Sequence, residues 1–170
     1  MLKYILYSTF LLCISCQNSS EISFHDLSNA FIDWYYKFHP VETSRKDIHK
    51  YHNKFQMYGI SENEEYIADL SRFIIELSQI DLTKLSEEIS IDYKMLLFNL
   101  EKKKFNMHFI RMWEWNPLIV LNEILNGLMS VTEKSELDMA DKVYGIKGRL
   151  ELIPQILVNS EKLLIYYSPI

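Results

Sequence analysis

The chain has 170 residues, 48% of them hydrophobic and 14% aromatic, which excludes a disordered protein and allows one domain with a hydrophobic core. Its four glycines and four prolines are too few for the many tight turns of a β-sandwich or β-barrel, so the composition favours an all-α fold. The net charge of −5 argues against nucleic-acid binding, because that function needs a basic surface to replace the counterions of the phosphates.

The first sixteen residues are typical of a bacterial export signal. Lys3 and the amino terminus precede an apolar stretch over residues 4–14, which is too short to span a bilayer core of roughly 30 Å. Ser15 and Cys16 follow, and this order resembles a lipoprotein signal in which the cysteine is lipidated and becomes the first residue; Cys13 departs from the usual leucine. We predict a signal peptide over 1–15, lipidation at Cys16, a tether over 16–22 and a helical domain over 23–170, located at the membrane of the cell envelope.

The pair Cys13 and Cys16 also forms a CxxC pattern, which is typical of redox and metal sites. Here the pattern lies at the edge of a segment that the signal peptidase would remove, so the redox interpretation is the weaker one. The chain has only these two cysteines, so the domain after Cys16 has no internal disulfide.

About five to six amphipathic helices are predicted after the tether, from apolar residues spaced three and four apart. The first covers residues 24–38, with Ser23 as its cap, and ends before Pro40, which cannot continue it. A polar, irregular stretch follows as far as Ile60. The second helix is expected to begin at a capping box formed by Ser61 and Glu64. Its buried face is predicted to contain Ile67, Leu70, Ile74 and Leu77.

The later helices also begin at recognisable caps. Ser86 is expected to cap the third helix, and the lysine run 102–104 to form its solvated end. The aromatic segment 105–115 has no clear assignment. Asn116 and Pro117 favour a helix start, with apolar side chains on one side of that helix. The last helical region starts near Ser135 and is expected to kink or break at Pro154. The predicted apolar stripes of these three helices contain Ile89, Tyr93, Leu96, Leu97 and Leu100; Leu118, Leu121, Leu125 and Leu128; and Leu137, Val143, Ile146, Leu150 and Ile153.

Few residues form a pattern that is typical of catalysis. His49 and His52 are three apart and can share a helical face as zinc ligands do, but no glutamate base and no third ligand accompany them, and surface histidines are the commoner explanation. The aromatic pair Trp113 and Trp115, with two nearby methionines, either lines a ligand groove or packs between helices. No HExxH, GxSxG or phosphate-binding glycine loop is present. The sequence therefore predicts no catalytic residue and no metal ligand in this chain.

Taken in order, these segments resemble the N-terminal part of a bacterial family known as domain of unknown function 885, over residues 27–168. Five segments carry the resemblance: Phe38-His39-Pro40 with Thr43; Ile48-His49-Lys50-Tyr51; Leu85-Ser86 through Ile91-Asp92-Tyr93 and Leu96; Trp113-Glu114-Trp115-Asn116-Pro117; and Arg149-Leu150 with Ile153-Pro154 and Leu157. Two positions depart from the family pattern. Asp47 stands where the family usually has glycine, and His52 stands where it usually has aspartate.

The resemblance implies a long, mostly helical protein of metallopeptidase type, whose HExxH zinc site lies downstream of the matched part. Zinc is then a cofactor of the longer protein, and none is expected in this chain. His49 and Tyr51 are the only matched polar positions that we expect on the substrate side. A part of such a protein should expose an apolar patch where the rest packs, and Leu163 to Tyr167 is the expected patch.

Three functions follow as hypotheses. The first is an exported, lipid-anchored N-terminal domain or fragment of a peptidase-like protein, which is not catalytic by itself and has the membrane and the C-terminal part as partners. The second is a stand-alone helical lipoprotein that binds a peptide or partner in its aromatic groove. The third is a small enzyme or metal protein that uses His49 and His52. Nucleic acid is not expected as a partner in any of them.

Overall fold

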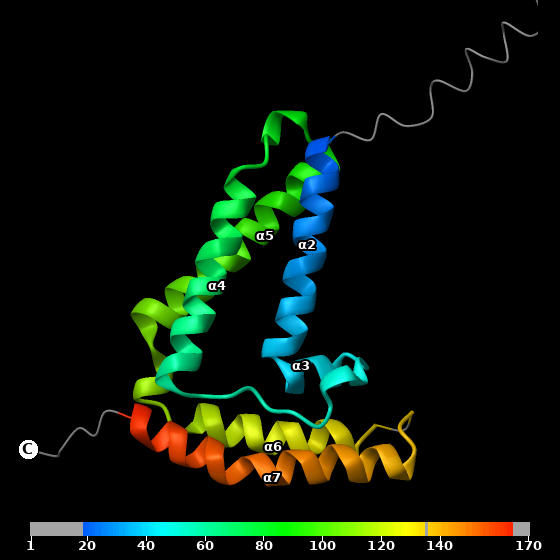
Figure 1. Cartoon of the computed structure of the whole chain (residues 1–170), viewed down its shortest axis with the longest axis vertical. Helices are drawn as coiled ribbons and strands as arrows, with labels where there is room; N and C mark the ends of the chain where they lie inside the picture. The colour runs from blue at the N-terminus through cyan, green and yellow to red at the C-terminus, as the bar shows by residue number, and fades with distance from the viewer. Residues whose placement is uncertain (1–18, 135, 165–170) are drawn as a thin grey trace, which may run out of the picture.

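The computed structural model describes residues 19–134 and 136–164, which fold into six α-helices, as Figure 1 shows. The connection between the second and third of these helices is a long, largely non-helical stretch. The predicted all-α fold is confirmed. The helices are α2 (Ser19–Phe38), α3 (Pro40–Arg45), α4 (Ile60–Ser78), α5 (Glu87–Phe105), α6 (Leu118–Thr132) and α7 (Met139–Leu163). None of these helices has the length and apolar character of a membrane span. The predicted signal peptide and Cys16 lie outside the described residues.

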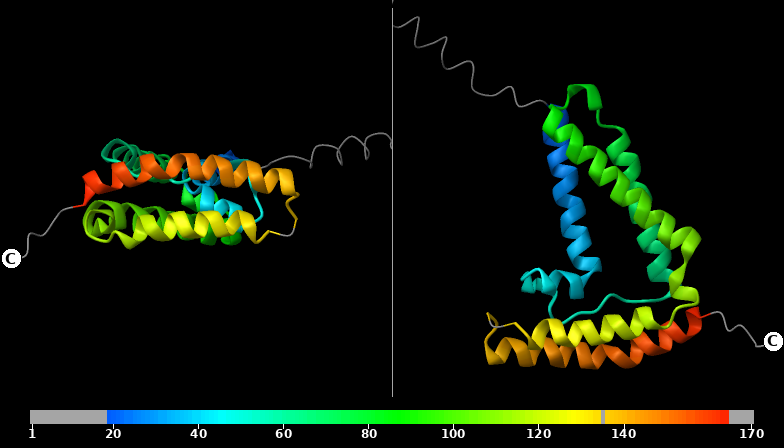
Figure 2. Two further views of the ribbon diagram at one scale, coloured as in Figure 1. Left: turned by 90° about the horizontal axis from the view of Figure 1, so that it is seen from below. Right: turned by 180° about the vertical axis from the view of Figure 1, so that it is seen from behind.

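The helices form two layers that meet at α3. Helices α2, α4 and α5 make the upper part in Figure 1, where α4 and α5 run antiparallel and α2 packs against both. Helices α6 and α7 form an antiparallel pair beneath them, and Figure 2 shows this pair side by side from below. The short helix α3 leads from the lower end of α2 onto α6. Each layer has its own hydrophobic core.

The upper core is built from large side chains at helical spacing. Leu70 and Leu77 of the predicted stripe are fully buried, and Leu100 of α5 is buried with them. Sequence analysis missed Tyr66 and Phe73, which are also buried and complete the inward face of α4. These side chains bury apolar area between three helices, and burial of that kind is the main source of stability in a helical domain.

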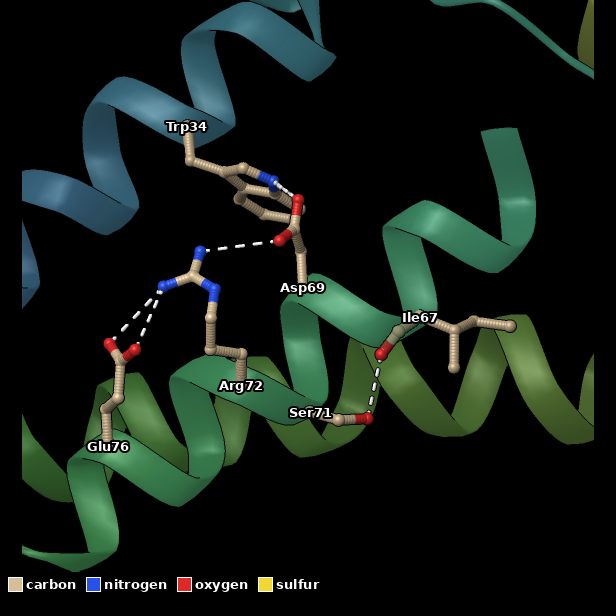
Figure 3. Close-up of polar contacts among 6 residues, drawn as sticks. All are labelled: Trp34, Ile67, Asp69, Ser71, Arg72 and Glu76. Carbon is tan, nitrogen blue, oxygen red and sulfur yellow. Dashed lines mark hydrogen bonds and ion pairs between the residues drawn. The ribbon is translucent and has the colours of Figure 1, made fainter. Parts of the chain in front are cut away.

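One hydrogen bond at the edge of this core joins α2 to α4. The indole Nε1 of Trp34 donates to Asp69 Oδ2 at 2.7 Å, as Figure 3 shows. Asp69 also pairs with Arg72 at 3.4 Å, and Arg72 pairs with Glu76 at 3.1 Å along the same helix. The half-buried indole therefore has a charged acceptor, which meets the need of its N–H away from water.

The lower core requires a close approach between the segment 52–58 and the α6–α7 pair. A Cβ atom on Gly127 of α6 would lie 2.1 Å from a ring carbon of Phe55, and one on Gly148 of α7 would lie 2.8 Å from the carbonyl oxygen of Asn53. Only glycine leaves room for these contacts. Phe55 and Ile156 are buried in the resulting core. The polar stretch before Ile60 is thus held tightly against two helices.

One predicted helix start is confirmed, and a second is confirmed to within one residue. Ser86 Oγ accepts from the backbone N–H of Ile89 at 3.5 Å at the start of α5. Helix α6 begins one residue later than expected, with Pro117 at the cap position in place of Asn116, and Asn116 Oδ1 accepts from the N–H of Leu118 at 3.1 Å just before it. In both cases a side-chain oxygen satisfies an N–H that has no partner within the helix.

Two other predicted caps are wrong. Helix α2 begins at Ser19, so Ser23 lies inside it and donates to the Ser19 carbonyl at 2.9 Å; residues 19–22, expected as tether, are helical. Helix α4 begins at Ile60 after Gly59, with no side-chain cap, so Ser61 lies within the first turn. A serine within the first turn of a helix can look like a cap in the sequence, because it can also be followed three residues later by a glutamate, as in a capping box.

The stretch before Ile60 is less irregular than predicted. It contains α3 and a 3-10 turn, His49–Tyr51 (η2). Pro40 ends the first helix as expected, but it also occupies the first turn of α3, where a missing N–H costs nothing. Sequence analysis missed α3 because six residues are too short for a periodic pattern.

The prediction of a break at Pro154 is wrong. Helix α7 continues through Pro154 as far as Leu163. Proline removes the hydrogen bond to the carbonyl of Leu150, but both residues are exposed, so water can satisfy that carbonyl. The packing of α7 along α6 then keeps the helix continuous on its inner side.

Candidate functional site

The two histidines that the sequence paired do lie together. Their ring centroids are 6.3 Å apart in an edge-to-face arrangement, and the His52 ring is 5.6 Å from Tyr144 of α7. His52 Nδ1 contacts the carbonyl oxygen of His49, so one nitrogen serves the local turn. In the part of the chain that the structure describes, no group of three or more metal-binding side chains occurs. The suggested roles of His49 and Tyr51 on the substrate side remain predictions.

Arg149 forms a buried hub of hydrogen bonds beside this region. Its side chain is fully buried, and its guanidinium donates to partners in α3, the segment 52–58 and α6. The acceptors are the carbonyl of Lys54 at 2.9 Å, the carbonyl of Gly127, Ser130 Oγ at 2.8 Å, Ser44 Oγ at 2.8 Å and the carbonyl of Pro40 at 3.5 Å. A planar fork of five N–H donors matches such a set, and lysine would not. Arg149 therefore joins four segments from across the chain.

Sequence analysis named Arg149 only as part of a family-like segment and did not predict its burial. A signal was available, because Arg149 shares a helix face with Gly145 and Ile156, both of which are buried. A charged residue on a helix face made of small and apolar residues is buried on folding, so it either has a polar partner within the protein or takes part in the function.

The structure shows a tight turn at Asp47, one of the two positions that depart from the pattern that the sequence resembles. Asp47 has a φ of 62°, in the left-handed region that favours glycine and tolerates aspartate. Its carboxylate pairs with Lys134, which also donates to the Arg45 carbonyl at 3.2 Å. The tight turn is therefore kept in this chain, with an ion pair that glycine could not make.

A second polar cluster surrounds His39, where α2, α3 and α4 meet. His39 Nδ1 lies 3.0 Å from Gln56 Oε1, and its Nε2 lies 2.9 Å from the hydroxyl of Tyr66. Because the amide oxygen can only accept, Nδ1 carries the proton and Nε2 accepts from Tyr66. Burial, together with the charge of Lys103, lowers the pKa of His39 to about 4. The ring is therefore neutral at pH 7, with both nitrogens occupied.

Charged residues extend this cluster toward the surface. Tyr35 donates to Glu42, which also pairs with Lys46 at 3.1 Å, and the ammonium of Lys103 lies 4.5 Å from the centre of the Tyr35 ring. Burial opposes ionisation of Glu42, but the bonds from Tyr35 and Lys46 outweigh it and hold its pKa below the ordinary value. Burial lowers the pKa of Lys103, offset in part by Glu42. The lysine run does end α5 as predicted, but Lys103 is partly buried and not simply solvated.

Glu123 of α6 bonds to the segment that contains Gln56, the partner of His39. Its Oε1 accepts from the backbone N–H of Gln56 at 3.3 Å. Burial raises the pKa of Glu123, while that bond and the charge of Arg149 act in the opposite direction. The polar groups around His39 bond to one another, so the cluster is suited to joining helices. Both ring nitrogens of His39 already have partners, so neither is free to exchange a proton with a substrate.

Replacing His39 with glutamine should flatten the dependence of stability on pH. The ordinary pKa of 6.5 applies to the unfolded chain, which takes up a proton near that pH, whereas the folded chain does so only near pH 4. The folded state of the natural chain is therefore fully favoured above pH 6.5 and loses up to about 3 kcal/mol as the pH falls from 6.5 to 4. Urea unfolding at pH 7 and pH 4.5 measures this loss.

The matched control for that experiment is His25→Gln, since His25 is exposed on α2. The control should keep the pH dependence of the natural chain. Equal pH dependence in His39→Gln and the natural chain would contradict the assignment of a neutral, buried His39.

Comparison with known proteins bears on the fold. No family model and no curated protein matches the chain. The solved structure of a candidate lipoprotein of unknown function from Shewanella oneidensis matches it with a TM-score of 0.76 and 19% sequence identity. The two proteins share a fold. The match covers 84% of this chain but 26% of the other, so this chain spans about a quarter of the length of that protein. The resemblance to domain of unknown function 885 therefore remains a prediction.

Proposed function

We propose that this chain is the N-terminal helical scaffold of a longer, exported and lipid-anchored protein of peptidase-like type, and that it catalyses no reaction by itself. The observation that carries the proposal is the apolar surface of α6 and α7. Helices that bury one face and expose large apolar residues on another face are typical of domains that pack against a further part.

The apolar surface consists of two stripes, one along each helix. The exposed stripe of α6 contains Leu118, Leu121, Leu125 and Met129, and that of α7 contains Met139, Val143, Leu150 and Leu157. Leu125 is 58% exposed and Val143 is 56% exposed, and both belong to the apolar stripes that the sequence predicted for these helices. Leu121 and Leu157 line the same hollow of about 200 Å³, so the two stripes meet there.

The expected patch from Leu163 to Tyr167 is corrected in its described part. Leu163 is only 6% exposed and belongs to the lower core, while residues 165–167 lie outside the described residues. The stripes of α6 and α7 replace it as the proposed packing surface.

The occupant that we propose for this surface is the remainder of a longer chain. Support comes from the Shewanella protein, in which this fold makes up about a quarter of the chain and the rest is available to cover such a surface. The description of that protein as a candidate lipoprotein also supports the proposed anchor at Cys16. The zinc site, and with it any peptidase activity, would then belong to the part that follows.

The association state of the chain from Cys16 onward, expressed without the signal peptide, tests this proposal. Sedimentation velocity should show association that rises with protein concentration, because the apolar stripes have no cover. The triple variant Leu121→Gln, Leu125→Gln, Leu157→Gln should be monomeric while its unfolding free energy stays within about 1 kcal/mol, because all three side chains are exposed.

A matched control replaces exposed polar residues on α7, Lys147→Gln with Glu151→Gln, and should associate like the natural chain. A natural chain that stays monomeric at all concentrations would count against the proposal. The nucleotide sequence downstream provides a second test, because a continuation that encodes HExxH is expected there, in frame or shifted.

A second candidate function is ligand binding by the lipoprotein itself. The observation that favours it is a pocket beside Trp113, one of the residues that the sequence placed in a possible aromatic groove.

A further inference from the structure

A hollow of about 470 Å³ lies where both layers meet, and its lining residues do not include His39 or its direct partners. It is lined by the first turn of α4, by the π-helical turn Asn106–Ile110 (η4), by the 3-10 turn Met112–Glu114 (η5) and by the end of α7. Its apolar wall includes Ile67, Met107 and Leu163, and Lys162 lies on its rim. A volume of this size suits a small organic ligand.

Two hydrogen-bond donors in the wall of this hollow have no acceptor within the protein. Only 5% of Asn63 is exposed, and its Nδ2 has no hydrogen-bond partner in the protein. The indole Nε1 of Trp113 is also buried and has no partner in the protein. Each unmet buried donor costs about 1–3 kcal/mol, so such groups are rare in folded proteins. Both residues line the same hollow, so a single ligand there would contact both.

The other two tryptophans show that a missing acceptor is not general among the indoles of this chain. Trp34 donates to Asp69 at 2.7 Å, and Trp115 donates to the Ile110 carbonyl at 3.1 Å. Among the three indoles, only that of Trp113 is buried with no protein acceptor. Among the indoles, the missing acceptor is therefore specific to Trp113.

The backbone next to Trp113 adds an independent observation. Arg111 joins η4 to η5 with φ 47° and ψ 44°, a left-handed conformation that costs a residue other than glycine about 1–2 kcal/mol. This conformation lets the Arg111 guanidinium lie 5.1 Å from the centre of the Trp113 ring, where it also pairs with Glu114. The left-handed backbone of Arg111 and the unpartnered donors of Asn63 and Trp113 therefore all belong to residues that line this hollow.

We infer that this hollow binds a small apolar ligand with a carbonyl or carboxylate oxygen, such as an N-acylated apolar amino acid. The oxygen accepts from Trp113 Nε1 and Asn63 Nδ2, and the apolar side chain packs against Ile67 and Met107. The uncapped start of α4 and the charge of Lys162 favour an oxygen with negative charge, while Glu64 on the same wall opposes it. Arg111 and Glu114 also line the hollow, and their charges pair with each other. This inference rests on the second candidate function and is independent of the scaffold proposal, whose test is association.

The indole signals of the ¹⁵N-labelled chain from Cys16 onward test the inference. N-acetyl-L-leucine supplies both oxygen types, and N-acetyl-L-leucinamide supplies only carbonyls. The indole N–H signal of Trp113, assigned with Trp113→Phe, should move saturably with at least one probe at millimolar concentration. The signals of Trp34 and Trp115 should stay in place, because those indoles already have acceptors.

Variants connect the response to the two donors. Asn63→Leu should weaken binding about tenfold, since it removes the amide donor of one hydrogen bond and keeps a branched side chain of similar shape. Trp113→Phe should weaken it similarly, read from the Asn63 amide signal, and it remains informative if Asn63→Leu does not fold. Trp115→Phe should leave the affinity unchanged. A preference for the acid that is lost in Lys162→Gln would identify a carboxylate ligand, and equal affinities would identify a carbonyl.

Three results would overturn the inference. The Trp113 signal stays in place with both probes, all three indole signals move together, or Trp113 shows only contact with an ordered water molecule. Because the scaffold proposal is tested by sedimentation, its failure and the failure of this inference are separately visible.

Discussion

Replacing Arg149 with methionine should lower the free energy of unfolding by about 3–5 kcal/mol, the largest stability loss that we expect from one substitution in this chain. Methionine fills similar space but donates no hydrogen bond. The carbonyls of Lys54 and Gly127 and the hydroxyls of Ser44 and Ser130 would then lose their buried donor. Since four segments meet at this side chain, the lower layer should lose its order first.

Urea unfolding followed by circular dichroism measures this loss. Lys147→Met, on an exposed position of the same helix, is the matched control and should change stability by less than about 0.5 kcal/mol. Arg149→Lys should fall between the two, because it keeps the charge without the planar fork. A loss below about 1 kcal/mol in Arg149→Met would show that the hub is not needed for the fold.

Replacing Cys16 with serine should abolish lipidation and release the protein from the membrane fraction. The lipid is attached to the cysteine sulfur in proteins that this signal resembles, and each buried CH₂ of an acyl chain contributes about 0.8 kcal/mol to membrane binding. No helix in the described part of the chain can replace that anchor as a span. The effect should therefore be all or none.

Partition between detergent and aqueous phases, with mass spectrometry of the mature amino terminus, measures the result. The natural chain should enter the detergent phase and begin at a lipid-modified Cys16. The matched control is Cys13→Ser, which leaves Ser15 and Cys16 in place and should be processed normally. A natural chain that is unmodified and aqueous would contradict the proposed anchor.

Local signals in the sequence predicted much of the fold. The helix starts near Ser86 and Asn116 were predictable because a cap depends on residues two or three apart. The start at Ser61 was wrong because the same spacing also occurs inside a first turn. The break at Pro154 was wrong because the exposure of the lost hydrogen bond depends on packing, which a local rule does not include.

Contacts between distant segments decided what the sequence could not predict. The closeness of His49 and His52 was predictable from their spacing. Asn63 and Trp113 come from different helical segments, and nothing in either segment indicates that both residues line one hollow. Arg149 likewise depends on acceptors about 20 to 110 residues away. Apolar periodicity predicts which helix face is hydrophobic, but it does not predict whether another segment of this chain packs on that face, as the exposed Leu125 and Val143 illustrate.

The separate hydrophobic cores of the two layers have a mechanical consequence. Few apolar side chains are shared between them, so the bundle of α2, α4 and α5 can keep its order while the α6–α7 pair shifts. Cooperativity between the layers then depends on polar links such as that of His39, which bonds to Tyr66 of α4 and to Gln56 of the segment held by Glu123. A partner that docks on α6 and α7 can therefore move this pair as a rigid unit while the bundle of α2, α4 and α5 stays folded.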